Sequence, residues 1–278
     1  MLDATLQKQL IDDGRDFMKG SKRDNPYRAF ESDQMRKLPQ PALTKPAMAE
    51  PSAAIDLPRD FEMLERKNDL LELLRDRRST RIYTQEQLTL LQLSFLLWAT
   101  QGVKGIRGKK YATLRTVPSG GARHAFETYL IVRNVAGLQV GAYHYLPMEH
   151  QLEFLHPIDD PETVITDTLK GQAWAAKASV VFYWSAVAYR AEWRYGIHAH
   201  RVALIDAGHV GQNLYLACTA LGIGTCAIAA FSHESCCQVF GLDGEEEYMV
   251  YTAPVGTARE ADLAQEQSFY SFVEKEGL

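Results

Sequence analysis

Three guanidinium groups and one hydroxyl lie within five residues, at Arg77, Arg78, Ser79 and Arg81. The forked donors of arginine match phosphate oxygens in bidentate geometry, and a serine hydroxyl adds one more donor. The spacing therefore indicates a clamp for a monoester phosphate. The alternative is a solvated helix end, because cations also stabilise the C-terminus of a helix. Composition alone does not separate these two interpretations.

A glycine pattern further along the chain has the spacing of a dinucleotide-binding turn. Gly222, Gly224 and Ala227 in "ALGIGTCAIAAF" give G-x-G-x-x-A, and Asp243 follows at about the distance expected of a ribose-binding carboxylate. That fingerprint needs a strand before the glycines and a helix after them. Here a long helix precedes them and a strand follows, so we expect Gly222 to end a helix and Gly224 to begin a strand.

A second glycine stretch, "RTVPSGGARHAFE" from Arg115 to Glu127, places Pro118 and Ser119 before two glycines. Without side chains, glycines let the backbone approach a flat ligand closely. We expect a helix to begin directly after them. Taken alone, the turn does not identify a ligand.

The histidines and cysteines show no spacing that suits a metal ion. His124, His198, His200 and His209 are scattered, and each is interpreted as a surface or core histidine. The four cysteines form no C-x-x-C pair, which favours reduced thiols. Cys236 and Cys237 are adjacent in an expected helix, where we expect only one of them to face the core. The sequence predicts no metal site.

Composition excludes several classes of protein. The 278 residues are 46% hydrophobic and 23% charged, with a net charge of -5, and the pI is 5.9. A nucleic-acid or anionic-membrane partner would need a concentrated basic face, so neither is expected. The N-terminus has acidic residues where an export signal would be apolar, which predicts a cytoplasmic protein. The uncharged run 210–232 contains Gln212, Asn213 and two central glycines, so we interpret it as a buried helix and strand.

A proline-rich segment divides the chain. Five of its eleven prolines lie in 38–58, which is typical of extended polypeptide without helix or sheet. A polar segment with one helix precedes it, and amphipathic periodicity begins at Phe61. We therefore predict an N-terminal arm and Pro-rich linker over 1–60 and one domain over 61–278.

Periodicity and capping signals locate the helices. Apolar residues from Met63 to Leu74 predict one helix, and Thr84 with Gln87 forms a capping box for the next, which would end at Gly102. We expect "KGIRGKK" to be a mobile loop. Further helices are predicted to begin at Pro161, at about Ala199 and after Ser232.

Apolar runs predict the strands "ETYLIVRNV", "VGAYHYL" and "QLEFLH" as an antiparallel meander. Three more are expected, at "ASVVFYWSAV", "TCAIAAF" and "EYMVYTAPVG". The acidic tail that follows is predicted to be weakly helical.

Four stretches in this order resemble one family. "RRSTRIY", "PSGGARH", "DAGHVGQNLYLACTALGIGTCAIAAF" and "FGLDGEEEYMVYTAPVG" are similar to the nitroreductase superfamily, specifically its SagB/ThcOx branch of azoline-oxidase-type dehydrogenases. The resemblance covers about residues 60–258, and the arm with "NPYRAFES" is similar to the one this branch carries. It implies an α+β fold, with a central, mostly antiparallel sheet flanked by helices. It also implies a homodimer with flavin mononucleotide (FMN) at the subunit interface.

The resemblance also implies roles for individual residues. Arg77, Ser79 and Arg81, with Arg78 beside them, would hold the FMN phosphate, and Arg259 would add charge there. The partner subunit's flavin ring would be approached by Pro118, Ser119 and Gly120. The ring would lie along Ala227, Ile228, Ala229 and Ala230, whose backbone N–H groups would face its N5 and O4 atoms.

The tripeptide "RYG" departs from the pattern of the azoline-oxidase branch, which carries Lys-Tyr-Gly and uses the Lys-Tyr pair in proton removal. Here Arg194 replaces the lysine, and Tyr195 remains. A guanidinium keeps its proton, so Arg194 can orient a substrate or stabilise an anion but cannot act as a base. The alternative is that neither residue has a functional role, with Arg194 solvated and Tyr195 half-buried.

These expectations define one main function and two rivals. The main one is an FMN-dependent oxidoreductase that passes hydride from a reductant, NAD(P)H, to a small or peptide-derived acceptor. The first rival is azoline dehydrogenation in peptide maturation. The second is a flavin-free interaction protein on the same scaffold, against which the intact Arg77 and Ser79 argue.

Overall fold

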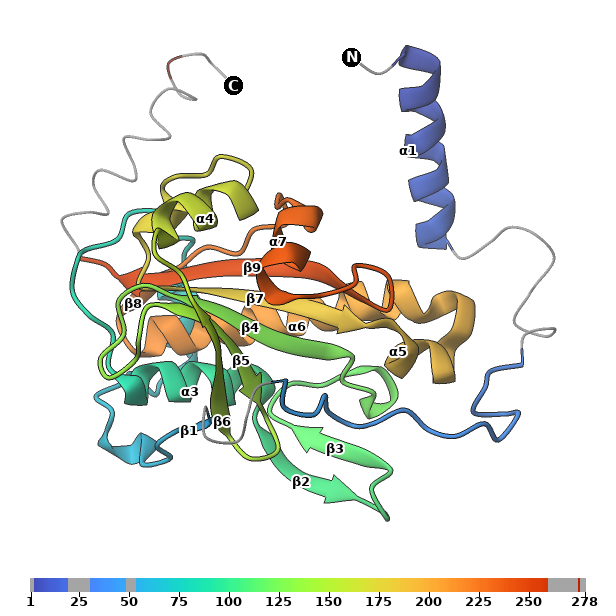
Figure 1. The fold of residues 1–278 in the computed structure, drawn as a ribbon, viewed down its shortest axis with the longest axis horizontal. Helices are drawn as coiled ribbons and strands as arrows, with labels where there is room; N and C mark the ends of the chain where they lie inside the picture. Colours follow the sequence, from blue (N-terminus) through green and yellow to red (C-terminus); the bar gives the residue numbers. More distant parts are fainter. Residues whose placement is uncertain (1–2, 20–30, 49–53, 260–274, 276–278) are drawn as a thin grey trace.

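The computed structural model describes residues 3–19, 31–48, 54–259 and 275. At its centre is a seven-stranded sheet with the order β1-β6-β5-β4-β7-β9-β8, in which every pair is antiparallel (Figure 1). The expected α+β architecture is confirmed. A separate two-stranded hairpin, β2-β3, projects beside the sheet.

The inner strands follow the apolar runs of the sequence. The meander consists of β4 (Phe126–Val132), β5 (Gly141–Leu146) and β6 (Gln151–Pro157). Next to it lie β7 (Val180–Val187) and β9 (Glu247–Thr257). Because both faces of β4 and β7 are covered, their residues are buried almost throughout, which explains their continuous apolar character.

Helices cover both faces of the sheet. One face packs against α3 (Leu90–Gln101) and α6 (Ala199–Ala220), and the other against α4 (Pro161–Thr168) and α7 (His233–Phe240). Successive residues of β4 alternate between these two cores, with Leu130 in the first and Ile131 in the second. The expected helix starts at Pro161, Ala199 and Ser232 are confirmed.

The prediction for the start of α3 was wrong by five residues. Its N-cap is Thr89, which forms a capping box with Gln92, whereas the backbone N–H of Thr84 donates to Thr257 across the sheet end. The sheet pairing competes for Thr84 and keeps it extended. The predicted C-cap, Gly102, is confirmed. The preceding helix, α2 (Leu70–Asp76), begins after the N-cap Asp69, while Met63 belongs to a short 3-10 turn, η3 (Phe61–Met63).

Three expected segments have a different structure. The "KGIRGKK" segment forms β2 (Val103–Arg107) and the turn into β3 (Ala112–Arg115), not an irregular loop. After the two glycines comes only the turn η4 (Gly120–Ala122), and then β4, so no helix begins there. The strand predicted over "TCAIAAF" ends early, because β8 is Ile223–Thr225 and only Ile228 bridges to Thr252 further on.

Two smaller expectations are also corrected. The proline-rich linker contributes an edge strand, β1 (Ala54–Asp56), which pairs with β6. Cys236 and Cys237 are both buried, because the turn at Gly244 covers the second thiol. The predicted helical tail, 260–278, lies outside the described residues apart from residue 275. The glycine interpretation is confirmed, since Gly222 follows α6 with φ +67° and Gly224 lies in β8.

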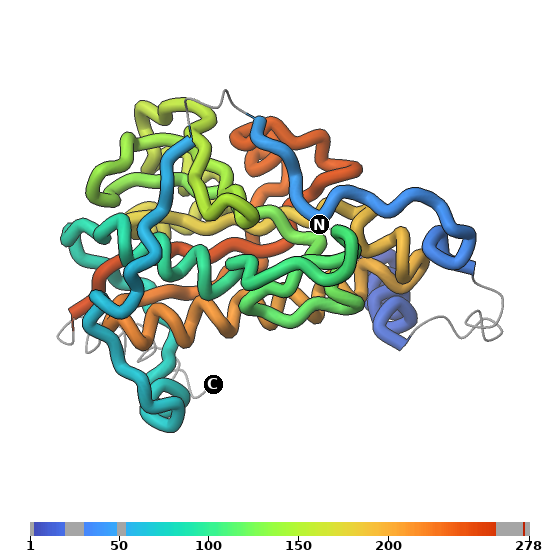
Figure 2. The backbone as a smooth tube through the Cα atoms, turned by 90° about the horizontal axis from the view of Figure 1, so that it is seen from below, coloured from blue at the N-terminus to red at the C-terminus, as the bar shows by residue number. Residues whose placement is uncertain are grey.

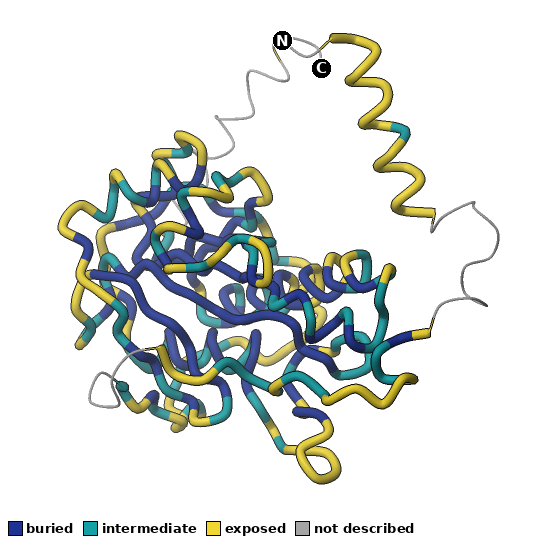
Figure 3. The backbone as a smooth tube through the Cα atoms, turned by 45° about the vertical axis from the view of Figure 1, so that its right-hand side comes forward, coloured by how far each residue is buried: buried dark blue, intermediate teal, exposed yellow. Residues whose placement is uncertain are grey.

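The first helix, α1 (Ala4–Lys19), has no buried residue and stands away from the sheet (Figure 3). A hydrogen bond from Arg201 to the carbonyl of Met18 (3.1 Å) connects its end to α6. Residues 31–48, by contrast, pack closely on the domain. They lie on the same side of the sheet as α7 (Figure 2).

This second part of the arm, residues 31–48, covers a buried polar cluster at one end of the sheet. Lys45 Nζ lies 2.6 Å from a carboxylate oxygen of Glu247 and 2.9 Å from the hydroxyl of Tyr129. The backbone N–H of Lys45 donates to Glu127 (2.9 Å), which also pairs with Arg190 (2.5 Å) and His144 (3.1 Å). The arm therefore adds one donor to each of two buried carboxylates, Glu127 and Glu247, and Lys45 supplies the positive charge at Glu247.

Electrostatic effects in the cluster follow from burial and pairing. Burial disfavours the ionised form of Glu127, but Arg190 and His144 outweigh it and lower the pKa of this carboxyl. Burial likewise opposes protonation of His144, but its two carboxylate partners, Glu127 and Glu153, raise the pKa of the imidazole. Each group holds its neighbour in the charged state.

Replacing Lys45 with Met should lower the free energy of unfolding by about 1.5–3 kcal/mol, because Glu247 loses a charge-assisted partner in a site with little water. The measurement is urea-induced unfolding followed by fluorescence. Lys19→Met is the control, since Lys19 pairs with Asp16 at 3.5 Å on the exposed surface of α1 and should contribute about 0–1 kcal/mol. Equal effects of the two substitutions would contradict the role given to Lys45.

Candidate functional site

The arginine-rich segment leaves the end of α2 and runs along the edge strand β8. The N–H of Thr80 donates to the carbonyl of Thr225 (2.9 Å). A Cβ on Gly224 would lie 2.6 Å from Thr80 Cγ2, so only glycine allows this approach. The segment is therefore held against the sheet at the residue between Ser79 and Arg81.

Tyr215 of α6 connects this segment to the one after β8. Its hydroxyl lies 2.9 Å from Ser79 Oγ and accepts a hydrogen bond from the N–H of Ala227 (2.9 Å). The guanidinium of Arg77 lies 5.3 Å from the centre of the Tyr215 ring, within cation–π range. The structure thus brings the Arg77 and Ala227 segments together through a residue that sequence reasoning missed. A single sequence gives no signal for it, because the contact is tertiary.

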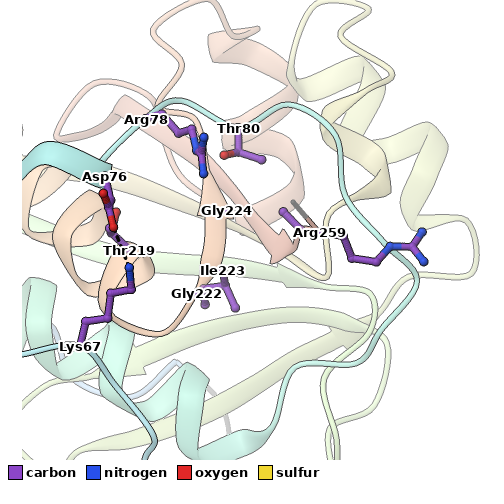
Figure 4. Close-up of a pocket in the computed structure, with 10 residues that line it drawn as sticks. Lys67, Asp76, Arg78, Thr80, Thr219, Gly222, Ile223, Gly224 and Arg259 are labelled. Carbon is purple, nitrogen blue, oxygen red and sulfur yellow. Dashed lines mark hydrogen bonds and ion pairs between the residues drawn. The ribbon is translucent and has the colours of Figure 1, made fainter. Parts of the chain in front are cut away.

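A cavity of about 210 Å³ opens beside this segment (Figure 4). Arg78, Lys67 and Arg259 line it, together with the backbone of 222–224. Lys67 Nζ pairs with Asp76 (2.6 Å) and Glu72 (2.9 Å), and these partners raise the pKa of Lys67 to about 12. In Figure 4 Arg78 extends toward Gly224, whereas the side chain of Arg259 extends away from Arg78.

The arginines of the clamp diverge in this structure. Arg77 lies over Tyr215, Arg78 lines the cavity, and Arg81 lies 6.0 Å from the centre of the Trp174 ring. Their guanidinium groups therefore belong to one basic edge and do not converge on a single point. In their present rotamers, some of these guanidinium groups could contact a phosphate bound there and others could not.

The expected ring-facing segment divides into exposed and buried residues. Ala229 and Ala230 are exposed and small, which leaves their backbone accessible. Ile228 is buried in the core beside α7, and its N–H and C=O pair with Thr252 (2.8 and 3.1 Å). Its backbone is thus already used by the sheet, whereas the two alanines remain the accessible part.

A second group of residues forms around the N-terminal part of α6. The carboxylate of Asp206 accepts the N–H of Gly120 (3.1 Å), and Ser119 Oγ accepts the N–H of His124 (2.9 Å). Burial raises the pKa of Asp206, although the hydrogen bonds from Ser119 and Gly120 oppose it. The turn that begins at Pro118 is therefore fixed on α6.

This turn lies directly against Arg194 and Tyr195. They end α5 (Ala188–Tyr195), which follows β7. A Cβ on Gly121 would lie 2.5 Å from Arg194 Nε and 2.8 Å from the Tyr195 hydroxyl, and Gly121 has φ +54°. Both the space and the backbone conformation require glycine here. The structure thus joins two motifs that are far apart in the sequence.

The two groups contact opposite halves of α6 within one chain. Asp206 touches the group with Arg194, and Tyr215 touches the group with Arg77. Nine residues of helix at 1.5 Å each separate them by about 13 Å along the axis. Each group is therefore half of a larger site or a site of its own.

The parts of the chain that the structure describes contain no group of three His, Cys, Asp or Glu side chains able to hold a metal ion. Among these residues no helix is both long and apolar enough to cross a bilayer.

Comparisons with known proteins match the chain to one family. The sequence pattern of the Nitroreductase family matches residues 74–257. A protein of Methanocaldococcus jannaschii named as a nitroreductase is 35% identical over 202 residues, which are 73% of this chain and 95% of that protein. The crystal structure of a Ralstonia eutropha JMP134 protein named as a nitroreductase gives a TM-score of 0.62 at 26% identity. It covers 80% of this chain and 95% of that one.

A third relative is the trifolitoxin-processing protein TfxB of Rhizobium leguminosarum bv. trifolii. It is 29% identical over 113 residues, which are 39% of this chain and 30% of TfxB. The region matched by the family pattern includes the arginine segment, the inner strands of the sheet and the whole of α6. This chain belongs to the nitroreductase family of oxidoreductases.

Proposed function

We propose that this protein is an FMN-dependent oxidoreductase that takes hydride from NAD(P)H and passes it to a small or peptide-derived acceptor. The observation that carries the proposal is the contact of Ser79, Tyr215 and Ala227. It brings a basic edge suited to a phosphate next to an accessible backbone segment suited to a flat ring. Family membership supports the flavin, since nitroreductase-family proteins usually bind one.

The residues of the first group fit the two ends of FMN. A phosphate monoester needs cations and donors, which Arg78 provides in the cavity and Arg77 and Ser79 provide beside Tyr215. A ring needs backbone donors and small side chains, which Ala229 and Ala230 provide. When bound, FMN would supply the hydride-carrying centre. The protein would bind and orient it, and keep water from one of its faces.

We further propose a homodimer, because the second group contacts the opposite half of α6 from the first. In a symmetric dimer the partner's copy of Ser119, Arg194 and Tyr195 would complete the site. Exposed apolar residues on α2 and near the start of α6 are candidates for the interface: Leu70, Leu71, Leu74, Ile197, Leu204 and Ile205. By contrast, the apolar face of α3 is covered within the chain, since Phe61 packs on Phe95 and Trp98.

Azoline dehydrogenation in peptide maturation is the second candidate, favoured by the similarity to the trifolitoxin-processing protein. That reaction removes a proton as hydride leaves the substrate. Arg194 cannot accept the proton, and its Nη1 is already 2.8 Å from the Tyr111 hydroxyl. We therefore rank reduction of an acceptor above azole formation.

Arg77→Ala should weaken FMN binding about 10- to 100-fold, because a charge-assisted contact to the phosphate is lost. Flavin occupancy is measured by absorbance of the purified protein and by titration of FMN into the apoprotein. Arg75→Ala is the matched control, since Arg75 is exposed on the same helix and should leave occupancy unchanged. Full occupancy of Arg77→Ala at low FMN would show that the clamp is assigned wrongly.

The protein should be a homodimer at micromolar concentration by light scattering, and Leu71→Asp should increase the monomer fraction. The reason is the cost of burying a charge within an apolar interface. Val140→Asp serves as control, because Val140 is exposed on the connection between β4 and β5. A native monomer that carries a full complement of flavin would refute the shared site.

The native enzyme should reduce a quinone or a nitroaromatic with NAD(P)H and form little or no azole from an azoline peptide. Arg194→Lys restores a side chain that burial can tune into a base, so any azole formation should increase in this variant. Both activities are measured by product mass and by NAD(P)H consumption. Efficient azole formation by the native protein would reverse our ranking of the two functions.

A further inference from the structure

We propose that Tyr111, on the turn between β2 and β3, is the proton donor to the acceptor and that Arg194 acts through it. The inference rests on the proposed oxidoreductase function and adds a residue to its acceptor site. It follows from a gap in that site, because Arg194 cannot exchange a proton. Arg194 donates to the hydroxyl of Tyr111, whereas it meets the neighbouring Tyr195 through the ring, 5.8 Å from the ring centre.

The hydroxyl of Tyr111 is held by two donors. Arg194 Nη1 lies 2.8 Å from it, and the side-chain amide of Gln34 donates to it at 3.0 Å. Within the described part of the chain, the structure records no acceptor for the proton of this hydroxyl. Both lone pairs are thus occupied, and the O–H bond remains available to a ligand.

Three segments converge on this phenol. Tyr111 belongs to the β2–β3 turn, Gln34 to the arm and Arg194 to the end of α5. A fourth contact comes from Arg123, whose guanidinium lies 4.8 Å from the Tyr111 ring centre. Arg123 also donates to the carbonyls of Tyr111 and Gly121 (both 3.0 Å), which connects the phenol to the glycine turn.

The surroundings favour release of the proton. Burial opposes ionisation of the phenol, but the hydrogen bond from Gln34 and the positive charges of Arg194 and Arg123 outweigh it and lower the pKa of Tyr111 below its usual value near 10. Tyr111 is 38% exposed, so a ligand can reach it. A phenol with a lowered pKa transfers its proton more readily at neutral pH.

Reduction of the acceptor consumes a proton, and we assign its transfer to Tyr111. A quinone or nitro group that receives a hydride from the reduced flavin must also receive a proton. In that step the O–H bond of Tyr111 breaks, and a bond from the proton to the acceptor's oxygen forms. The resulting phenolate is stabilised by Arg194 and Arg123, and water then returns the proton.

The first test is a titration of the phenols by ultraviolet absorbance. In native protein one phenol should ionise at lower pH than the others, and Tyr111→Phe should lack it. Tyr189→Phe is the matched control, because the Tyr189 hydroxyl also bonds to the arm, at Asp33 (3.0 Å), and no arginine among the described residues bonds to it. It should retain the early titration. Loss of the early titration in Tyr189→Phe alone would overturn the proposal.

The second test is steady-state kinetics on flavin-loaded protein. Tyr111→Phe should lower kcat for the acceptor about 100-fold or more, while reduction of the flavin by NAD(P)H stays at the native rate. A donor works only when protonated, so native kcat should fall as pH rises through the pKa of Tyr111, and this limb should be absent in Tyr111→Phe. Gln34→Leu should move the limb to higher pH.

The two tests distinguish failure of the proposed function from failure of the role given to Tyr111. A native protein that binds no flavin would overturn the proposed function. Flavin-loaded Tyr111→Phe with native kcat and an unchanged pH limb would overturn the role of Tyr111 alone.

Discussion

The buried carboxylate of Glu127 is the constraint on which the position of α5 depends. It lies in β4 with its side chain 1% exposed and pairs with Arg190 of α5. An unpaired charge at this depth would cost several kcal/mol, so the helix, the arm and His144 must all be in place to satisfy it. Because Arg194 and Tyr195 lie one turn after Arg190, the geometry of the candidate acceptor site follows from this ion pair.

The long helix α6 connects the glycine turn to the arginine segment. Asp206 fixes the glycine turn, and Tyr215 fixes the arginine segment and the chain after β8. A helix with one face buried against the sheet is a stiff spacer. Nine residues of this helix separate Asp206 from Tyr215, about 13 Å along the axis, and the homodimer proposed above would bring one chain's group together with the partner's.

Sequence patterns predicted the inner strands because both of their faces are buried. Continuous apolar runs such as "ASVVFYWSAV" have few alternatives to a central strand. The failures occur where the chain is polar or short. The β2–β3 hairpin is rich in glycine and lysine and is held by contacts of Tyr111 and Arg123, which no local pattern reveals. Thr84 had the spacing of an N-cap, but pairing with Thr257 placed it at the end of the sheet.

The candidate site, like the fold, was predictable only where its residues are close together in the sequence. The arginine segment is local in sequence, so composition indicated a candidate phosphate clamp, although it did not separate this interpretation from a solvated helix end. Tyr215 and Tyr111 were not predictable, because each gains its place through residues far away in the chain. Tyrosines are common, and most serve packing. Their importance here follows from the distances at their hydroxyls, all near 2.8–3.0 Å.

The choice of arginine in both half-sites has a physical consequence. The protein carries a net charge of -5, yet Arg77, Arg78 and Arg194 place positive charge where, in the proposed function, a phosphate or the oxygen atom of an acceptor would approach. Guanidinium groups stay charged across the working pH range, so attraction of the ligand does not change with pH. The proton for the acceptor must then come from a neighbouring side chain that can titrate. A phenol bonded to one of these guanidiniums meets that requirement, because the fixed charge stabilises the phenolate that forms when the proton leaves.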